Sequence, residues 1–84
     1  MAWFVYIARC ADDTLYCGIT NDLQARVAAH NAGKGARYTR SRTPIAILAT
    51  RRCRTKGRAL SIEYEVKQLT RPAKERLVAE WAAG

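Results

Sequence analysis

The chain has only 84 residues, and this length constrains its fold more than any other feature. A chain this short forms one domain and buries only about 60–65% of the surface that it exposes when unfolded. It has room for one small core and one shallow site, which excludes TIM barrels and doubly wound nucleotide-binding folds. Apolar residues make up 49% of the chain, too many for a disordered basic tail. We therefore expect one folded domain over residues 1–84.

The apolar residues are too dispersed for a membrane protein. The longest apolar run covers residues 3–8, far fewer than the roughly 20 residues that a membrane span needs. No basic segment precedes this run, so a signal peptide is not indicated either. These features predict a cytoplasmic protein without a membrane partner.

Positive charge gathers in the middle of the chain. The formal net charge is +8, yet neither residues 1–22 nor residues 63–84 carry an excess of basic residues. The segment between them holds no acidic residue and ten basic ones: Arg26, Lys34, Arg37, Arg40, Arg42, Arg51, Arg52, Arg54, Lys56 and Arg58. Such cations repel one another unless an anion lies beside them, and a polyphosphate gains affinity by releasing counterions. The pattern favours a nucleic acid partner over a solvated basic surface.

Residues 3–19 predict a β-hairpin. Two runs rich in β-branched and aromatic residues flank a segment with turn chemistry. A turn centred near Ala11 would place Tyr6 opposite Tyr16. Both phenols then share a face with Gly18, which leaves space beside them, whereas the other face is uniformly apolar and is expected to be core.

The rest of the chain predicts three helices and one more strand. A helix is expected from an N-cap at Asn21 to about residue 31, with Leu23 and Val27 on its buried stripe. The later elements are a basic loop, a strand and two helices, expected at residues 33–44, 45–50, 56–69 and from 72 onward. The order β-β-α-β-α-α predicts an α+β domain, a three-stranded antiparallel sheet flanked by helices.

Glu63 has two interpretations. It lies next to the apolar stripe of the second long helix, so it is either the ion-pair partner of Lys67 or a ligand facing a site. Spacing alone favours the ion pair. Arg26 and His30 are four residues apart and can reach a common ligand, although each alone would suit a solvated helix.

Together these residues resemble the GIY-YIG nuclease family. Residues 4–6 and 16–18 are similar to its two signature triplets, with tyrosines ten residues apart. Three further motif positions match in order: Arg26, His30 and Glu63. The resemblance covers about residues 2–78, the expected core of the domain, and is closest to the family's small stand-alone branch.

The resemblance implies phosphodiester hydrolysis with one divalent cation, Mg²⁺ or Mn²⁺, bound by Glu63. It also implies that Tyr6 or Tyr16 acts as general base, with its pKa lowered by Arg26 or the metal. Arg26 would stabilise the charge that develops on the phosphate, and His30 would contact the phosphate or the water network.

The expected function is a metal-dependent DNA endonuclease. Gly18 would support its site, and the expected nucleic-acid contacts are Lys34, Arg37, Tyr38, Arg40, Arg42 and Lys67. One small domain has little surface for reading bases, so we expect low sequence specificity on single-stranded, branched or damaged DNA, or specificity supplied by a protein partner. Charge does not distinguish DNA from RNA.

Two residues depart from the family pattern. Phe4 replaces the glycine of the first triplet, and Ile19 replaces a lysine that often follows the second. These departures leave open an alternative from another class, a non-catalytic nucleic-acid-binding module that keeps the nuclease scaffold. The retained carboxylate of Glu63 argues against this alternative, because simple phosphate binding has no use for it.

Overall fold

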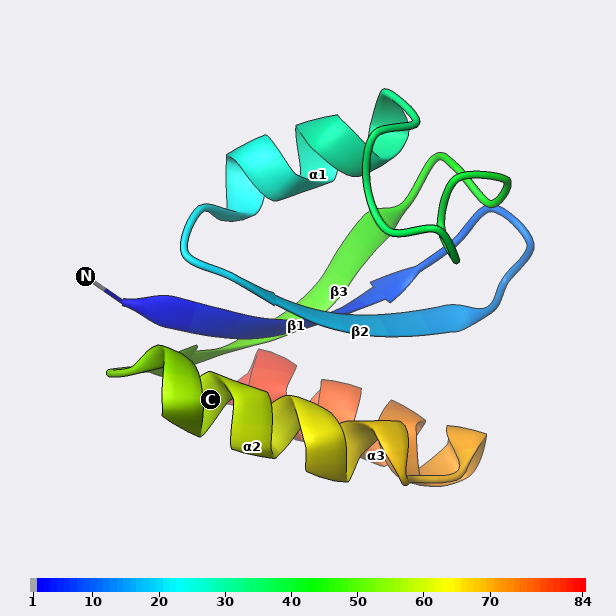
Figure 1. Ribbon diagram of the computed structural model, residues 1–84. Coiled ribbons are helices and arrows are strands. Elements are labelled where there is room, and N and C mark those ends of the chain that lie inside the picture. The colour runs from blue at the N-terminus through cyan, green and yellow to red at the C-terminus, as the bar shows by residue number, and fades with distance from the viewer. Residues whose placement is uncertain (1) are drawn as a thin grey trace.

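The computed structural model describes residues 2–84 as a three-stranded sheet with helices on both faces. The strands are ordered β2-β1-β3, and both neighbouring pairs are antiparallel. Figure 1 shows α1 over one face of the sheet and α2 and α3 over the other. The elements are β1 (Trp3–Arg9), β2 (Leu15–Thr20), α1 (Leu23–Asn31), β3 (Ala46–Cys53), α2 (Lys56–Lys67) and α3 (Arg71–Ala83). The predicted α+β fold and its order β-β-α-β-α-α are confirmed.

Strand β1 is the centre of the molecule because both of its faces are covered. Val5 and Ile7 point toward α2 and α3, whereas Tyr6 and Ala8 point toward α1, and all four are buried. A strand enclosed on both faces needs a continuous apolar run, and the start of this chain supplies one.

The hairpin between β1 and β2 has a register that differs from the prediction. Tyr6 pairs with Gly18, and Tyr16 pairs with Ala8, so the expected pairing of Tyr6 with Tyr16 is wrong. The turn is centred one residue later than expected, because Asp13 adopts a left-handed φ of 69° and Asp12 accepts hydrogen bonds from Thr14. A shift of two residues in pairing keeps every side chain on its predicted face.

The main core lies between the sheet and the two C-terminal helices. The apolar face of the hairpin packs there, with Val5, Ile7 and Cys17 against Ile62 and Val66 of α2. Helix α2 covers β1 and β2, and α3 lies against β3. The predicted core face of the hairpin is therefore confirmed.

Helix α1 differs from the prediction at its start and on its buried face. Its N-cap is Asp22 rather than Asn21, and the Asp22 carboxylate accepts a hydrogen bond from the Ala25 amide at 3.1 Å. An ionised side chain is the better acceptor at a positive helix terminus. Leu23 and Val27 are only half-buried, because the last turn of the helix, at His30, faces into the molecule.

The helices are short throughout the described chain. The longest, α3, has 13 residues. Within residues 2–84, no helix has the length and apolar character needed to cross the hydrocarbon core of a bilayer.

The packing of α2 predicts a large difference between two neighbouring substitutions. Ile62 is 4% exposed and Leu60 is 45% exposed on the same helix. Ile62→Ala leaves a cavity under the sheet and should lower the free energy of unfolding by about 2–5 kcal/mol. The matched control Leu60→Ala should change it by about 0.5 kcal/mol or less, measured by chemical denaturation. Equal losses for both variants would contradict this packing.

Candidate active site

Three rings gather on the face of the sheet that α1 covers. Tyr6 comes from β1, Tyr16 from β2 and His30 from the last turn of α1. The ring centroids lie 6.2 Å apart for the two tyrosines, 6.3 Å for Tyr6 and His30, and 5.5 Å for Tyr16 and His30. Residues distant in sequence thus form one aromatic cluster over β1 and β2.

Gly18 provides the space that Tyr6 occupies. A Cβ atom at this position would lie 2.5 Å from the Tyr6 hydroxyl oxygen and 2.7 Å from its Cζ atom. Any side chain would displace the Tyr6 ring, because the ring lies directly over the backbone of β2. The space that the sequence predicted beside the phenols is therefore filled by Tyr6 itself.

His30 is enclosed rather than facing a substrate. Its side chain is 0% exposed, and its ring is hydrogen-bonded to the Tyr6 hydroxyl at 3.0 Å and to Thr39 Oγ1 at 2.6 Å. The resemblance implied that His30 contacts the phosphate or the water network, whereas in this structure both of its ring nitrogens are hydrogen-bonded to protein groups. His30 thereby holds Tyr6 in place.

The loop after α1 closes over His30. Thr39 is buried, and its hydroxyl donates to the Ala36 carbonyl at 2.9 Å. A Cβ atom at Gly35 would lie 2.1 Å from His30 Nδ1 and 2.8 Å from His30 Cα. Thr39 and Gly35 are not among the predicted site residues, since the loop has no hydrophobic periodicity and only its glycine hints at a close approach.

Arg26 is the charged member of the cluster. The half-buried guanidinium interacts with the Tyr6 hydroxyl, which raises the pKa of Arg26. Burial raises the pKa of Tyr6 to about 12, although Arg26 opposes this effect. In the protein alone, desolvation of the Tyr6 phenolate thus outweighs the charge of Arg26. Lowering of the pKa by a metal, and Tyr16 as the base, stay predictions.

Tyr38 and Arg42 extend the cluster, and both make contacts within the protein. The Tyr38 ring stacks on Tyr16, with centroids 5.8 Å apart and planes 22° apart, and the Arg42 guanidinium lies 4.1 Å from the Tyr38 centroid. Arg42 also pairs with Asp12 at 2.8 Å. Arg42 thus ties the loop to the β1–β2 turn in the protein alone, and its contact with nucleic acid stays a prediction.

The other predicted basic contacts lie on the surface. Lys34, Arg37 and Arg40 are exposed, and no ion pair involves them within the described part of the chain. Their charges are available to an anion. Lys67 differs, since its ammonium lies 3.6 Å from the Glu63 carboxylate.

Glu63 lies on α2, on the face of the sheet opposite α1 and near the edge strand β2. Its side chain is 19% exposed, and its ion pair with Lys67 confirms the interpretation that spacing favoured. The charge of Glu63 adds to burial in raising the pKa of Cys17 to about 12, so the carboxylate lies near the face of β2 opposite Tyr16. Because β2 is an edge strand, this carboxylate can meet the tyrosine cluster only around that edge.

The described residues suit a metal ion that the substrate helps to bind. Within residues 2–84, no group of three or more His, Cys, Asp or Glu side chains converges on one point. One partly exposed carboxylate, that of Glu63, would suit Mg²⁺ or Mn²⁺, because these ions keep several water ligands and take others from phosphate. The site could therefore be completed by a bound nucleic acid.

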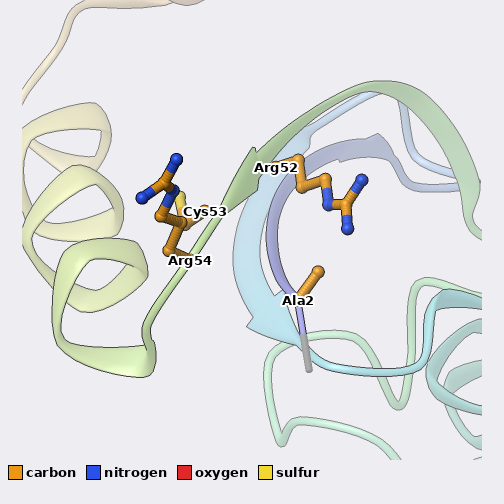
Figure 2. Close-up of a pocket in the computed structure, with 4 residues that line it drawn as sticks. All are labelled: Ala2, Arg52, Cys53 and Arg54. Carbon is orange, nitrogen blue, oxygen red and sulfur yellow. The ribbon is translucent and has the colours of Figure 1, made fainter.

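A separate hollow of about 560 Å³ lies where β1 begins and β3 ends, lined by Ala2, Arg52, Cys53 and Arg54. In Figure 2 the side chains of Arg52, in β3, and of Arg54, just after its end, lie on opposite sides of the ribbon and point away from one another. Their guanidinium groups do not converge on one ligand. We therefore place the candidate active site at the tyrosine cluster.

Comparison with known proteins finds one family model and similar relatives. Residues 2–76 match the model of the GIY-YIG catalytic domain. A UPF0213 protein from Natronomonas pharaonis is 51% identical over 77 residues, which cover 92% of this chain and 91% of the relative. A UPF0213 protein from Bacillus velezensis is 48% identical over 92% of this chain and 78% of its own length.

Two solution NMR structures share the fold. The UPF0213 protein from Bacillus halodurans is 46% identical, with a TM-score of 0.61 over 94% of this chain and 84% of that one. A protein from E. faecalis is 30% identical, with a TM-score of 0.68 over 100% of this chain and 90% of that one.

The closure of the loop over His30 predicts a strong effect at Gly35. Gly35→Ala places a methyl group against the His30 ring and backbone, and should lower the free energy of unfolding by about 1–3 kcal/mol. Gly57 in α2 has open space around it, so the matched control Gly57→Ala should leave stability unchanged or raise it by up to about 1 kcal/mol. Chemical denaturation compares the two, and an undiminished stability of Gly35→Ala would refute the close approach.

Proposed function

Because the chain belongs to the GIY-YIG catalytic domain family, a family of nucleases, we propose that it is a metal-dependent endonuclease that cleaves DNA with low sequence specificity. The observation that carries this proposal is the cluster of Tyr6 and Tyr16, whose ring centroids lie 6.2 Å apart, with Arg26 near enough for both phenols to raise its pKa. Phosphodiester hydrolysis needs an activated water, neutralised phosphoryl charge and a stabilised leaving group. This cluster has groups suited to the first two needs.

Arg26 is the proposed stabiliser of the phosphate. Its guanidinium is permanently charged, half-buried and oriented by Tyr6, so little reorganisation is needed when negative charge develops on the phosphoryl oxygens. Partial burial strengthens this interaction relative to one in bulk water.

Either tyrosine is a candidate general base, and their environments differ. Tyr6 is 1% exposed and has a raised pKa, so at neutral pH it is a phenol that accepts a proton only after further positive charge stabilises its phenolate. Tyr16 is half-buried and lies beside the loop. In this proposal one tyrosine first loses its phenolic proton to solvent, and as a phenolate it then receives a proton from the attacking water; the other tyrosine orients Arg26.

Glu63 is the proposed ligand of a divalent cation. A bound Mg²⁺ or Mn²⁺ would neutralise phosphoryl oxygens at the edge of β2. Lys67 pairs with the carboxylate in the protein alone and would be free to contact phosphate when this ion pair is broken. The Glu63 carboxylate would thus face a cation both without substrate, where it pairs with Lys67, and with substrate, where it binds the metal.

The proposed substrate is held through its phosphates. Lys34, Arg37 and Arg40 are exposed on the loop that carries Thr39, next to the tyrosine cluster. Side chains of this kind bind the sugar–phosphate backbone irrespective of sequence. Such a surface suits single-stranded, branched or damaged DNA, with any further specificity supplied by a protein partner.

Glu63→Gln tests the catalytic proposal most simply. The change removes the charge that would hold the cation, so nicking of plasmid DNA with Mg²⁺ or Mn²⁺ should fall on the order of 100-fold or more. DNA binding should persist, because the basic loop is untouched. Glu65→Gln is the matched control on the same helix, since Glu65 is exposed, and should keep the wild-type rate. Binding without cleavage by the wild type on plasmid, single-stranded and branched DNA would favour the non-catalytic binding module.

The loop proposal predicts a change in the salt dependence of binding. Replacing Lys34, Arg37 and Arg40 together by alanine should weaken DNA binding and flatten the plot of log affinity against log salt by about 0.9 for each phosphate of duplex DNA that the protein no longer neutralises. Fluorescence anisotropy over a salt series gives both quantities. Arg76→Ala, an exposed change on α3, is the control and should alter neither. An unchanged slope in the triple variant would place the DNA elsewhere.

A further inference from the structure

The histidine beneath the cluster has a hydrogen-bond arrangement that can be assigned from its partners. His30 is the single histidine of the chain, and it is enclosed between Tyr6 and Thr39. Within residues 2–84, no buried side-chain nitrogen or oxygen lacks a hydrogen-bond partner. Each ring nitrogen of His30 therefore has one partner, and the direction of each bond depends on where the ring proton lies.

Thr39 determines that direction. A threonine hydroxyl has one hydrogen, and Thr39 donates it to the Ala36 carbonyl at 2.9 Å. The short contact of 2.6 Å between Thr39 Oγ1 and His30 Nδ1 must then have its proton on the histidine. Nδ1–H donates to Thr39, whose oxygen accepts through its remaining lone pairs.

The opposite nitrogen follows from the charge state of the ring. Burial, with a contribution from the charge of Arg26, lowers the pKa of His30, so the ring is neutral at pH 7 and carries one proton. That proton is on Nδ1, which leaves Nε2 as an acceptor. The Tyr6 hydroxyl consequently donates to Nε2 across 3.0 Å.

The loop excludes competing partners for Nδ1. The Gly35 backbone lies against this edge of the ring, where a Cβ atom would be 2.1 Å from Nδ1. Thr39 itself is 0% exposed, so water does not reach its hydroxyl from the surface. The chain of donors runs from Tyr6 through His30 and Thr39 to the Ala36 carbonyl without an open position.

We propose that Thr39 is a positioning residue: its hydroxyl fixes His30 in the Nδ1–H tautomer, which directs the Tyr6 proton into the protein and leaves the Tyr6 oxygen to accept from Arg26. Its consequence for catalysis rests on the nuclease function proposed above. The loop thereby sets the direction of the Tyr6 hydroxyl proton through His30, although Thr39 is not itself one of the proposed catalytic groups.

The single histidine makes the tautomer directly measurable. Long-range ¹H–¹⁵N NMR spectra of the labelled protein distinguish the two neutral forms, and no other imidazole contributes signals. We expect the Nδ1–H form in the wild type and in Thr39→Ser, which keeps the hydroxyl. Thr39→Val keeps the shape but removes the acceptor, so the Nε2–H form should appear. The Nε2–H form in the wild type, which needs no variant to fold, would overturn the proposal.

Cleavage assays add the functional consequence. Thr39→Val should reduce the nicking rate by about tenfold with little change in DNA affinity, whereas Thr39→Ser should stay near the wild type. Thr43→Val makes the same change in the same loop at a half-buried position and should keep the wild-type rate and the Nδ1–H form. A Thr39→Val protein with the wild-type tautomer and rate would refute the positioning role. If the wild type itself does not cleave DNA, the nuclease proposal fails, and the spectra alone decide the role of Thr39.

Discussion

The hydrogen bond between Tyr6 and His30, continued by the bond from His30 to Thr39, joins three parts of the molecule that are distant in sequence. Tyr6 belongs to the central strand, His30 ends the helix above it, and Thr39 extends the chain of hydrogen bonds into the following loop. All three residues are almost fully buried, so loss of one partner would leave a buried polar group without a hydrogen bond. The shape of the loop depends on this chain, because Thr39 and Ala36 are its last two members.

The proposed catalytic groups are divided between the two faces of the sheet. The tyrosines lie under α1, which carries Arg26, whereas Glu63 lies on α2 near Cys17, on the opposite face. The edge strand β2 is the place where the two sides can meet, because no further strand separates them there. A phosphate at this edge could contact the basic loop on one side and a cation held by Glu63 on the other. This division explains why the protein alone has no preformed cage of metal ligands among its described residues.

Much of the fold was predictable because it depends on local signals. Turn residues and runs rich in β-branched and aromatic residues located the strands of the hairpin, and the order of elements is as expected. The error in hairpin register came from Asp13, whose left-handed conformation moved the turn. The closure of the loop over His30 was not predictable, because Gly35 and Thr39 acquire their roles only through contacts with a helix and strand elsewhere in the chain. The pairing of Arg42 with Asp12 likewise joins residues thirty positions apart, and no local sequence pattern predicts it.

The central claim is that Glu63 and the tyrosine cluster form one site around the edge of β2. Mn²⁺ titrated into ¹⁵N-labelled protein, with and without a short single-stranded DNA, tests this claim through the amide signals that the paramagnetic ion broadens. We expect broadening centred on Glu63 and on residues 16–18 of β2, and stronger when DNA is present, because phosphate oxygens complete the coordination. Broadening centred on Asp12 and Asp13, with the signals of Glu63 and β2 unaffected, would contradict the account.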